Sequence, residues 1–121
     1  VDPLYVLPPA PRRPIPDVGG ARTRARATLL SLLSPEAQRE FEAHGRFRVR
    51  GSAGGQYIVE GHGYSMNVLR ADSRLRLCAH PQMREDGGDL PREDALIAQL
   101  LMLQFDEPGF LAIANRGEAY A

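Results

Sequence analysis

The sequence contains no lysine and a single cysteine, Cys78. A lone cysteine excludes a disulfide within the chain and is typical of a reducing compartment. All 15 basic residues are therefore arginines. Two explanations are open: a GC-rich genome whose codons favour arginine, or selection for guanidinium groups that contact carboxylates or phosphates.

The sequence also lacks an apolar run close to the roughly 20 residues of a membrane span, and it lacks the pattern of a signal peptide. We therefore expect no membrane partner and no secretion by a signal peptide.

The formal net charge is zero, but the two ends of the chain differ in sign. Residues 1–80 hold 12 arginines and 7 acids, a net charge of +5, whereas residues 81–121 hold 3 arginines and 8 acids, a net charge of −5. A chain with halves of opposite sign can pair with copies of itself or present each half to a different partner.

Six of the ten prolines lie in residues 1–20, which end in a glycine pair. Proline lacks an N–H group and restricts the residue before it, so we expect an extended arm in place of a helix or an inner strand. Such an arm docks either on its own domain or on a neighbouring chain. Its apolar anchors are Leu4, Tyr5, Val6, Leu7 and Ile15.

The remaining residues, 21–121, predict a single small α+β domain that starts with two helices. The first covers residues 21–33. The second begins with Ser34 as N-cap and Pro35 at the first helical position, and runs to about His44, where Gly45 ends it.

A three- or four-stranded antiparallel meander follows, because apolar and polar residues alternate there with a period of two. The glycine-rich segment 51–55 predicts a hairpin turn; it is no phosphate-binding loop, because no Lys-Ser/Thr pair or helix follows it. The predicted strands are 46–50, 56–60, 64–70 and 74–80.

A C-terminal helix pair is expected to pack on the sheet. The first member runs from about Pro91 to Phe105, residues 106–109 interrupt it, and the second covers residues 110–115. The acid pairs at residues 93–94 and 106–107 lie at the predicted helix starts. We expect them to stabilise the helices by interaction with the helix dipole and not to act in acid–base catalysis.

One face of the meander is rich in arginine. Three readings are open: a solvated sheet face, a docking site for an acidic protein, or a weaker nucleic-acid site without aromatic residues for base stacking. The candidate partner-binding residues on this face are Arg46, Arg48, Arg50, Arg74 and Arg76.

Cys78 and His80 share one strand face, and His62 lies between two glycines. A zinc site needs further ligands that one cysteine cannot supply. Residues two apart on a strand have Cα atoms about 6.5–7 Å apart, so His80 is poorly placed to activate the thiol. We therefore expect no catalytic residue, metal or cofactor, with a Cys78-dependent enzyme as the least favoured class.

A set of short motifs is spread along the chain: Leu33-Ser34-Pro35-Glu36 to Phe41, Gly45-Arg46-Phe47, Arg50-Gly51-Ser52, Leu77-Cys78-Ala79-His80-Pro81, Leu90-Pro91, Asp94, Ala98-Gln99-Leu100, Asp106-Glu107, Phe110-Leu111 and Ala114-Asn115. Together these motifs resemble a small uncharacterised domain of bacterial and bacteriophage hypothetical proteins. The resemblance covers about residues 25–116, and the pair Leu100-Leu101 stands where the family has a lysine after the glutamine. It implies a phage or prophage origin and no known activity.

Together these patterns predict a non-enzymatic structural or adaptor protein that docks on other chains through its arm and its charged faces. Its most concrete form is a minor structural component of a phage-like particle, located in the bacterial cytoplasm or the assembled virion. The alternative is a small regulatory module that binds nucleic acid through the arginine-rich sheet face.

Overall fold

The computed structural model describes residues 18–61, 66–73, 75–79 and 91–118. The predicted anchors of the N-terminal arm lie outside these residues. So do Arg74 of the predicted arginine-rich face and the two histidines that were considered as partners of the Cys78 thiol. The predicted residues outside the described part are Leu4, Tyr5, Val6, Leu7, Ile15, His62, Arg74 and His80.

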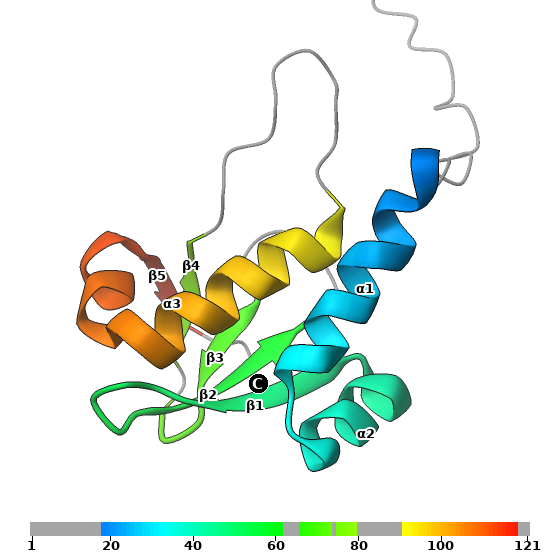
Figure 1. Ribbon diagram of the computed structural model, residues 1–121. Helices are drawn as coiled ribbons and strands as arrows, with labels where there is room; N and C mark the ends of the chain where they lie inside the picture. Colours follow the sequence, from blue (N-terminus) through cyan, green and yellow to red (C-terminus); the bar gives the residue numbers. More distant parts are fainter. Residues whose placement is uncertain (1–17, 62–65, 74, 80–90, 119–121) are drawn as a thin grey trace, which may run out of the picture.

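The protein is an α+β structure, as the sequence predicts, with two helices before the sheet and one long helix after its fourth strand (Figure 1). The helical elements are η1 (Val18–Gly20), α1 (Ala21–Leu32), α2 (Pro35–His44) and α3 (Arg92–Ile113). The strands are β1 (Arg46–Arg50), β2 (Gln56–Glu60), β3 (Val68–Arg70), β4 (Leu75–Cys78) and β5 (Asn115–Glu118).

The sheet has five strands in the order β1-β2-β3-β4-β5, and each neighbouring pair is antiparallel. The prediction of three or four strands was wrong, because it placed Asn115 at the end of a helix and left out β5. This strand has the sequence Asn-Arg-Gly-Glu, which lacks the apolar alternation of a half-buried strand. It forms because β4 offers it a pairing edge.

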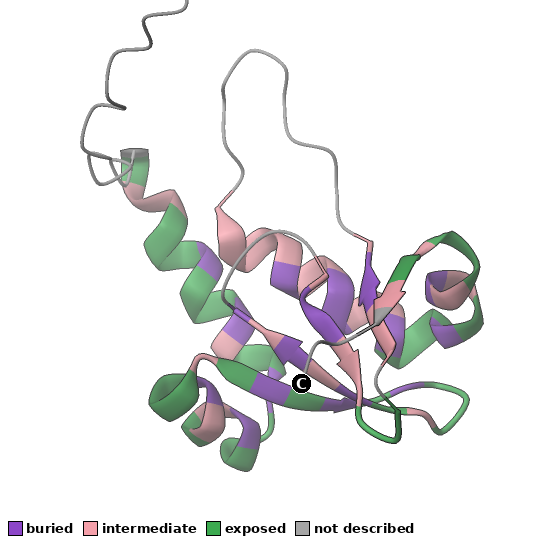
Figure 2. Ribbon diagram, turned by 180° about the vertical axis from the view of Figure 1, so that it is seen from behind, coloured by how far each residue is buried: buried purple, intermediate pink, exposed green. Residues whose placement is uncertain are grey.

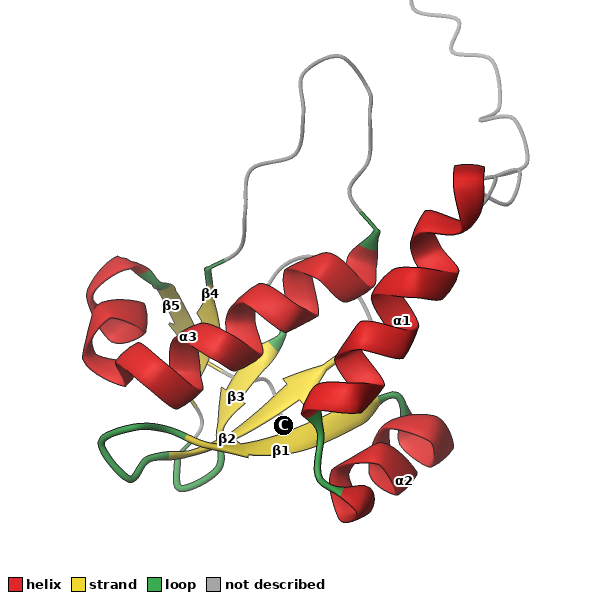
Figure 3. Cartoon of the chain, viewed as in Figure 1, coloured by secondary structure: helices red, strands yellow, loops and turns green. Residues whose placement is uncertain are grey.

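The hydrophobic core lies between the sheet and the helices α1 and α3, which cover one face of the sheet (Figures 1 and 3). We call this face the inner face. Buried and exposed residues alternate along β1, as Figure 2 shows. The largest wholly buried side chains of the core are Tyr57, Phe47, Phe110, Leu29, Leu77, Leu100, Leu103, Val59 and Val68.

The boundaries of α2 follow from local capping, as predicted. The Ser34 hydroxyl accepts a hydrogen bond from the Ala37 N–H at 3.1 Å, and Pro35 opens the helix. Gly45 ends it in the left-handed conformation, at φ 71°, which glycine adopts without steric cost. The helix then lies beside β1, where Phe41 packs edge-on against Phe47.

A break at Asp106 divides α3, because this residue has the non-helical angles φ −152° and ψ 60°. The Asp106 carboxylate accepts a hydrogen bond from the Gly109 N–H at 3.1 Å, so it caps the turn that follows. Where a pair of helices was predicted, the structure therefore has one helix with a break at the predicted interruption.

Helix α3 is long and apolar enough to span a membrane by length and composition alone. In this fold it is the core helix, because its residues Leu96, Leu100 and Leu103 are buried against the rest of the domain.

Candidate functional site

The predicted arginines of β1 form a row on the face of the sheet opposite the inner face, which we call the outer face. Arg46, Arg48 and Arg50 are all exposed and alternate with the buried residues of the strand. Neighbouring members of the row are two residues apart, so their Cα atoms lie roughly 6.5–7 Å from each other. Three guanidinium groups thus point from one strand toward the same side.

Glu40 of α2 partly balances this positive row. Its carboxylate lies 3.7 Å from the Arg46 guanidinium and 3.8 Å from that of Arg48. The arginine side chains are nevertheless 52% and 76% exposed, so these are weak surface pairs that leave both groups open to another charge. Arg50 lies further along the strand, next to the hairpin.

Arg76 lies on the outer face too, but at a distance from the β1 row and in a different environment. Its guanidinium contacts the Glu60 carboxylate at 2.5 Å and donates to the Met66 carbonyl at 3.2 Å. This side chain is 29% exposed. The structure therefore brings Arg46, Arg48 and Arg50 together, whereas the Arg76 guanidinium is held by β2 and by the segment before β3.

An apolar centre separates the two arginine positions. Strand register places Arg48 opposite Ile58, Ile58 opposite Leu69, and Leu69 opposite Arg76, which makes one row across four strands. Ile58 and Leu69 are half-buried. The outer face therefore combines a partly open apolar middle with guanidinium groups at both sides, a composition suited to contact with another protein surface.

A second cluster surrounds the carboxylate of Glu107, which is only 3% exposed. Its oxygen Oε1 accepts hydrogen bonds from the backbone N–H of Ala53 at 2.8 Å and of Gly55 at 3.2 Å. The other oxygen, Oε2, accepts one from the Tyr57 hydroxyl at 2.5 Å. The carboxylate thus lies inside the turn between β1 and β2, where donors from the protein replace water.

These contacts move the pKa values of both side chains. Burial by itself raises the pKa of the Glu107 carboxyl, but hydrogen bonds from Tyr57, Ala53 and Gly55 outweigh it, and the pKa lies below its usual value. For Tyr57, burial and then the hydrogen bond to Glu107 raise the pKa from 10.0 to about 12. The pair is therefore a charged acceptor and a neutral donor at neutral pH.

The hairpin is shaped around this carboxylate. A Cβ atom at Gly51 or at Gly55 would overlap the Glu107 side chain, so glycine at both positions leaves room for it. The Ser52 hydroxyl accepts a hydrogen bond from the Glu107 N–H at 2.9 Å, and the Ser52 N–H donates to the Leu103 carbonyl at 2.9 Å. Both oxygens of the Glu107 carboxylate are thus occupied by donors from the hairpin and from β2.

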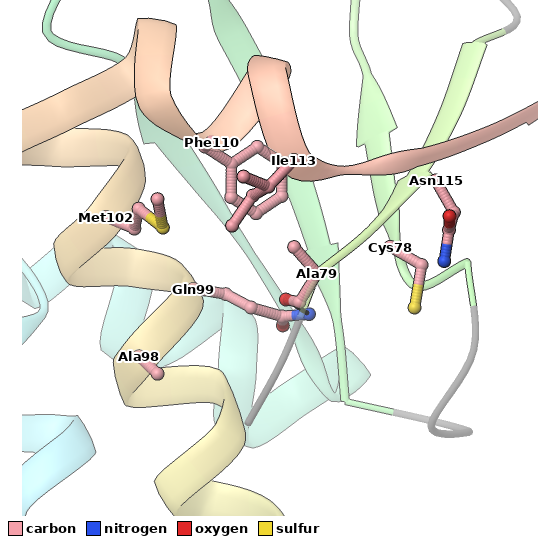
Figure 4. Close-up of a pocket in the computed structure, with 8 residues that line it drawn as sticks. All are labelled: Cys78, Ala79, Ala98, Gln99, Met102, Phe110, Ile113 and Asn115. Carbon is pink, nitrogen blue, oxygen red and sulfur yellow. Dashed lines mark hydrogen bonds between the residues drawn. The ribbon is translucent and has the colours of Figure 1, made fainter. Parts of the chain in front are cut away.

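A pocket of about 460 Å³ lies between α3 and the strands β4 and β5 (Figure 4). Its apolar wall consists of side chains from α3, and Cys78 and Asn115 line its strand side (Figure 4). The apolar residues from α3 are Ala98, Met102, Phe110 and Ile113.

One buried polar residue, Gln99, forms part of the pocket and is fully engaged inside the fold. Its amide exchanges two hydrogen bonds of 2.8 Å with the Asn67 amide. It also donates to the Ala79 carbonyl at 3.0 Å. These bonds tie α3 to the ends of β3 and β4, so the floor of the pocket is fixed.

Cys78 is a buried cysteine on β4, opposite Asn115 of β5. Its predicted neighbour His80 lies outside the described residues, so the Cys–His arrangement is not placed. Among the described residues, no group of three His, Cys, Asp or Glu side chains is close enough to hold a metal ion.

Sequence reasoning missed Glu107 and Gln99, two described residues whose buried side chains each make several polar contacts within the fold. The pattern Asp-Glu-Pro at 106–108 predicted helix-start acids, which fits Asp106 but not its neighbour. The sequence signal that could have indicated a buried side chain here was the pair of glycines at positions 51 and 55. Only glycine at these positions leaves room for the Glu107 side chain.

Comparison with known proteins adds no assignment to this geometry. No protein-family model matches the chain. No curated protein matches it. No solved structure matches it.

Proposed function

We propose that the chain is a non-enzymatic structural protein that docks on other protein chains, copies of itself included, through the outer face of its sheet. The observation that carries this proposal is the row of three exposed arginines on β1 beside the half-buried Ile58 and Leu69. Interfaces typically combine a central apolar area with a rim of polar and arginine side chains.

A copy of the chain is a suitable partner because the two ends of the sequence carry opposite net charge. The +5 of residues 1–80 and the −5 of residues 81–121 favour contacts between copies over repulsion. The resemblance of residues 25–116 to bacterial and bacteriophage proteins makes a phage-like particle the most concrete setting. In that setting the N-terminal arm is proposed to lie along a neighbouring subunit.

Sedimentation velocity with two matched double variants tests this proposal. R48S/R50S removes two charges from the outer face, whereas R22S/R24S removes two exposed charges from α1, on the other side of the sheet. We expect the wild type and R22S/R24S to associate alike with rising concentration, and R48S/R50S to associate at least tenfold more weakly. A monomer at every concentration in all three proteins overturns the proposal.

The alternative function, nucleic-acid binding by the same arginines, has its own signature. Fluorescence anisotropy with a short labelled DNA duplex would show an affinity that falls steeply with salt, because bound counterions are released. Weak binding of equal strength to R48S/R50S and R22S/R24S would indicate general charge attraction and exclude a site on the outer face.

A further inference from the structure

We propose that the pocket between α3, β4 and β5 binds a neutral small molecule with an apolar body and one hydrogen-bonding group. Its volume of about 460 Å³ falls within the range of roughly 300–1,000 Å³ that is typical of small-molecule sites. A cavity of about 150 Å³ already holds benzene, so this pocket has room for two fused rings. The site uses none of the outer-face residues that carry the proposed docking, namely Arg46, Arg48, Arg50, Ile58 and Leu69.

The apolar body is inferred from the helix side of the pocket. Phe110 is wholly buried and provides a fixed aromatic wall, and Met102 provides an adaptable thioether beside it. Ile113 belongs to the same lining but is 63% exposed. A bound apolar ligand would cover this isoleucine, so its burial would add to the favourable free energy of binding.

The ligand's lack of charge is inferred from the chemistry of the lining. None of the eight lining residues in the described part of the chain is Asp, Glu, Lys, Arg or His. An ionised ligand would lose its water here without gaining an opposite charge, which is strongly unfavourable. The buried Gln99 amide is already hydrogen-bonded to Asn67 and Ala79, so it makes no demand for a charged partner.

The single hydrogen-bonding group is inferred from the opposite side of the pocket. Figure 4 shows the Cys78 and Asn115 side chains together on the strand side, away from Met102. Asn115 is exposed, and its amide can both donate and accept. A hydroxyl or amide at one end of the ligand would therefore lie toward Asn115, with the rings against α3.

The probe is 2-naphthol, and naphthalene-2-sulfonate of nearly equal size is the charged comparison. Binding is followed by NMR of ¹³C-labelled methionine and isoleucine methyl groups in the full chain. We expect saturable shifts at Met102 and Ile113 with 2-naphthol, and at least tenfold weaker binding of the sulfonate. Absence of saturable shifts at these methyls, or equal affinity for both probes, overturns the proposal.

A pair of matched substitutions locates the site. A98F fills the pocket from α3, and A27F places the same side chain on an exposed position of α1. We expect A98F to lose at least tenfold in affinity for 2-naphthol and A27F to lose nothing. A folded A98F with wild-type affinity contradicts the proposal.

If A98F does not fold, a measurement on the wild-type protein still tests the proposed site. Cys78, the chain's only cysteine, lines the pocket, so bound 2-naphthol should slow its alkylation by iodoacetamide severalfold. An alkylation rate that saturating 2-naphthol leaves unchanged would contradict a site at this place.

Discussion

The Tyr57 hydroxyl donates a hydrogen bond of 2.5 Å to the Glu107 carboxylate, which joins β2 to the residue after the break in α3. Fifty residues separate the two in sequence. The same carboxylate accepts from Ala53 and Gly55, so one side chain fixes the first hairpin to the last part of the core helix. The position of α3 on the sheet therefore depends on a polar contact as well as on apolar packing.

Replacing either partner should destabilise the fold. We expect E107Q and Y57F each to lower the free energy of unfolding by about 1.5–3 kcal/mol, because each removes a hydrogen bond to a buried charged group. Urea unfolding measures the change. The double variant should lose less than the sum of the two, since both act on one contact.

Glu42 provides the control for these variants, because it is an exposed glutamate on α2. E42Q should stay within about 0.5 kcal/mol of the wild type. If E107Q and E42Q lower the free energy of unfolding equally, the buried hydrogen bonds of Glu107 add no stability beyond the effect of its charge.

The stability should depend on pH in two separate ranges. The pKa of Glu107 is lowered on folding, so its contribution is present above its ordinary value of 4.5 and is lost as the pH falls through the folded value. The pKa of Tyr57 is raised to about 12, so its contribution is present below pH 10.0 and is lost between pH 10.0 and about 12.

Unfolding free energies of the wild type, E107Q and Y57F as a function of pH measure these contributions. The advantage of the wild type over E107Q should shrink below pH 4.5, and its advantage over Y57F should shrink above pH 10.0. Differences that stay constant across both ranges would disagree with the shifted pKa values.

Gly51 should tolerate no side chain while Glu107 is present. A Cβ atom there overlaps the Glu107 carboxylate, so G51A is expected to cost about 1–3 kcal/mol. In the background of E107A, which removes that carboxylate, the same change should cost less than half as much. An equal cost of G51A in both backgrounds would mean that the strain arises elsewhere.

The Asn67–Gln99 amide pair should behave as a unit. N67L or Q99L leaves one buried amide without its partner, and each should cost about 1–3 kcal/mol in urea unfolding. The double variant N67L/Q99L should cost clearly less than the sum. Strict additivity would indicate that the two amides stabilise the fold independently.

Local signals were sufficient to predict the parts of the fold that depend on neighbouring residues. Ser34 and Gly45 define α2 by capping, and the alternation of apolar residues defines β1 and β2 with their observed bounds. In α2 the capping hydrogen bonds follow directly from the residue types, and in β1 and β2 the buried face does.

The missing parts depend on contacts between distant segments. Strand β5 is a short edge strand that forms by pairing with β4, and its own residues carry no strand pattern. Glu107 resembles an ordinary helix-start acid until the hairpin, about 50 residues earlier, folds around it. Likewise, only the register across β2, β3 and β4 places Arg76 against Glu60.

The most direct test of docking through the outer face is a dilution series of the ¹⁵N-labelled full chain, followed by NMR. We predict that amide shifts which change with concentration cluster at Arg48, Ile58 and Leu69, while those of Ala27 and Thr28 on α1 stay constant. Spectra that do not change with concentration, or changes confined to α1, would contradict the account.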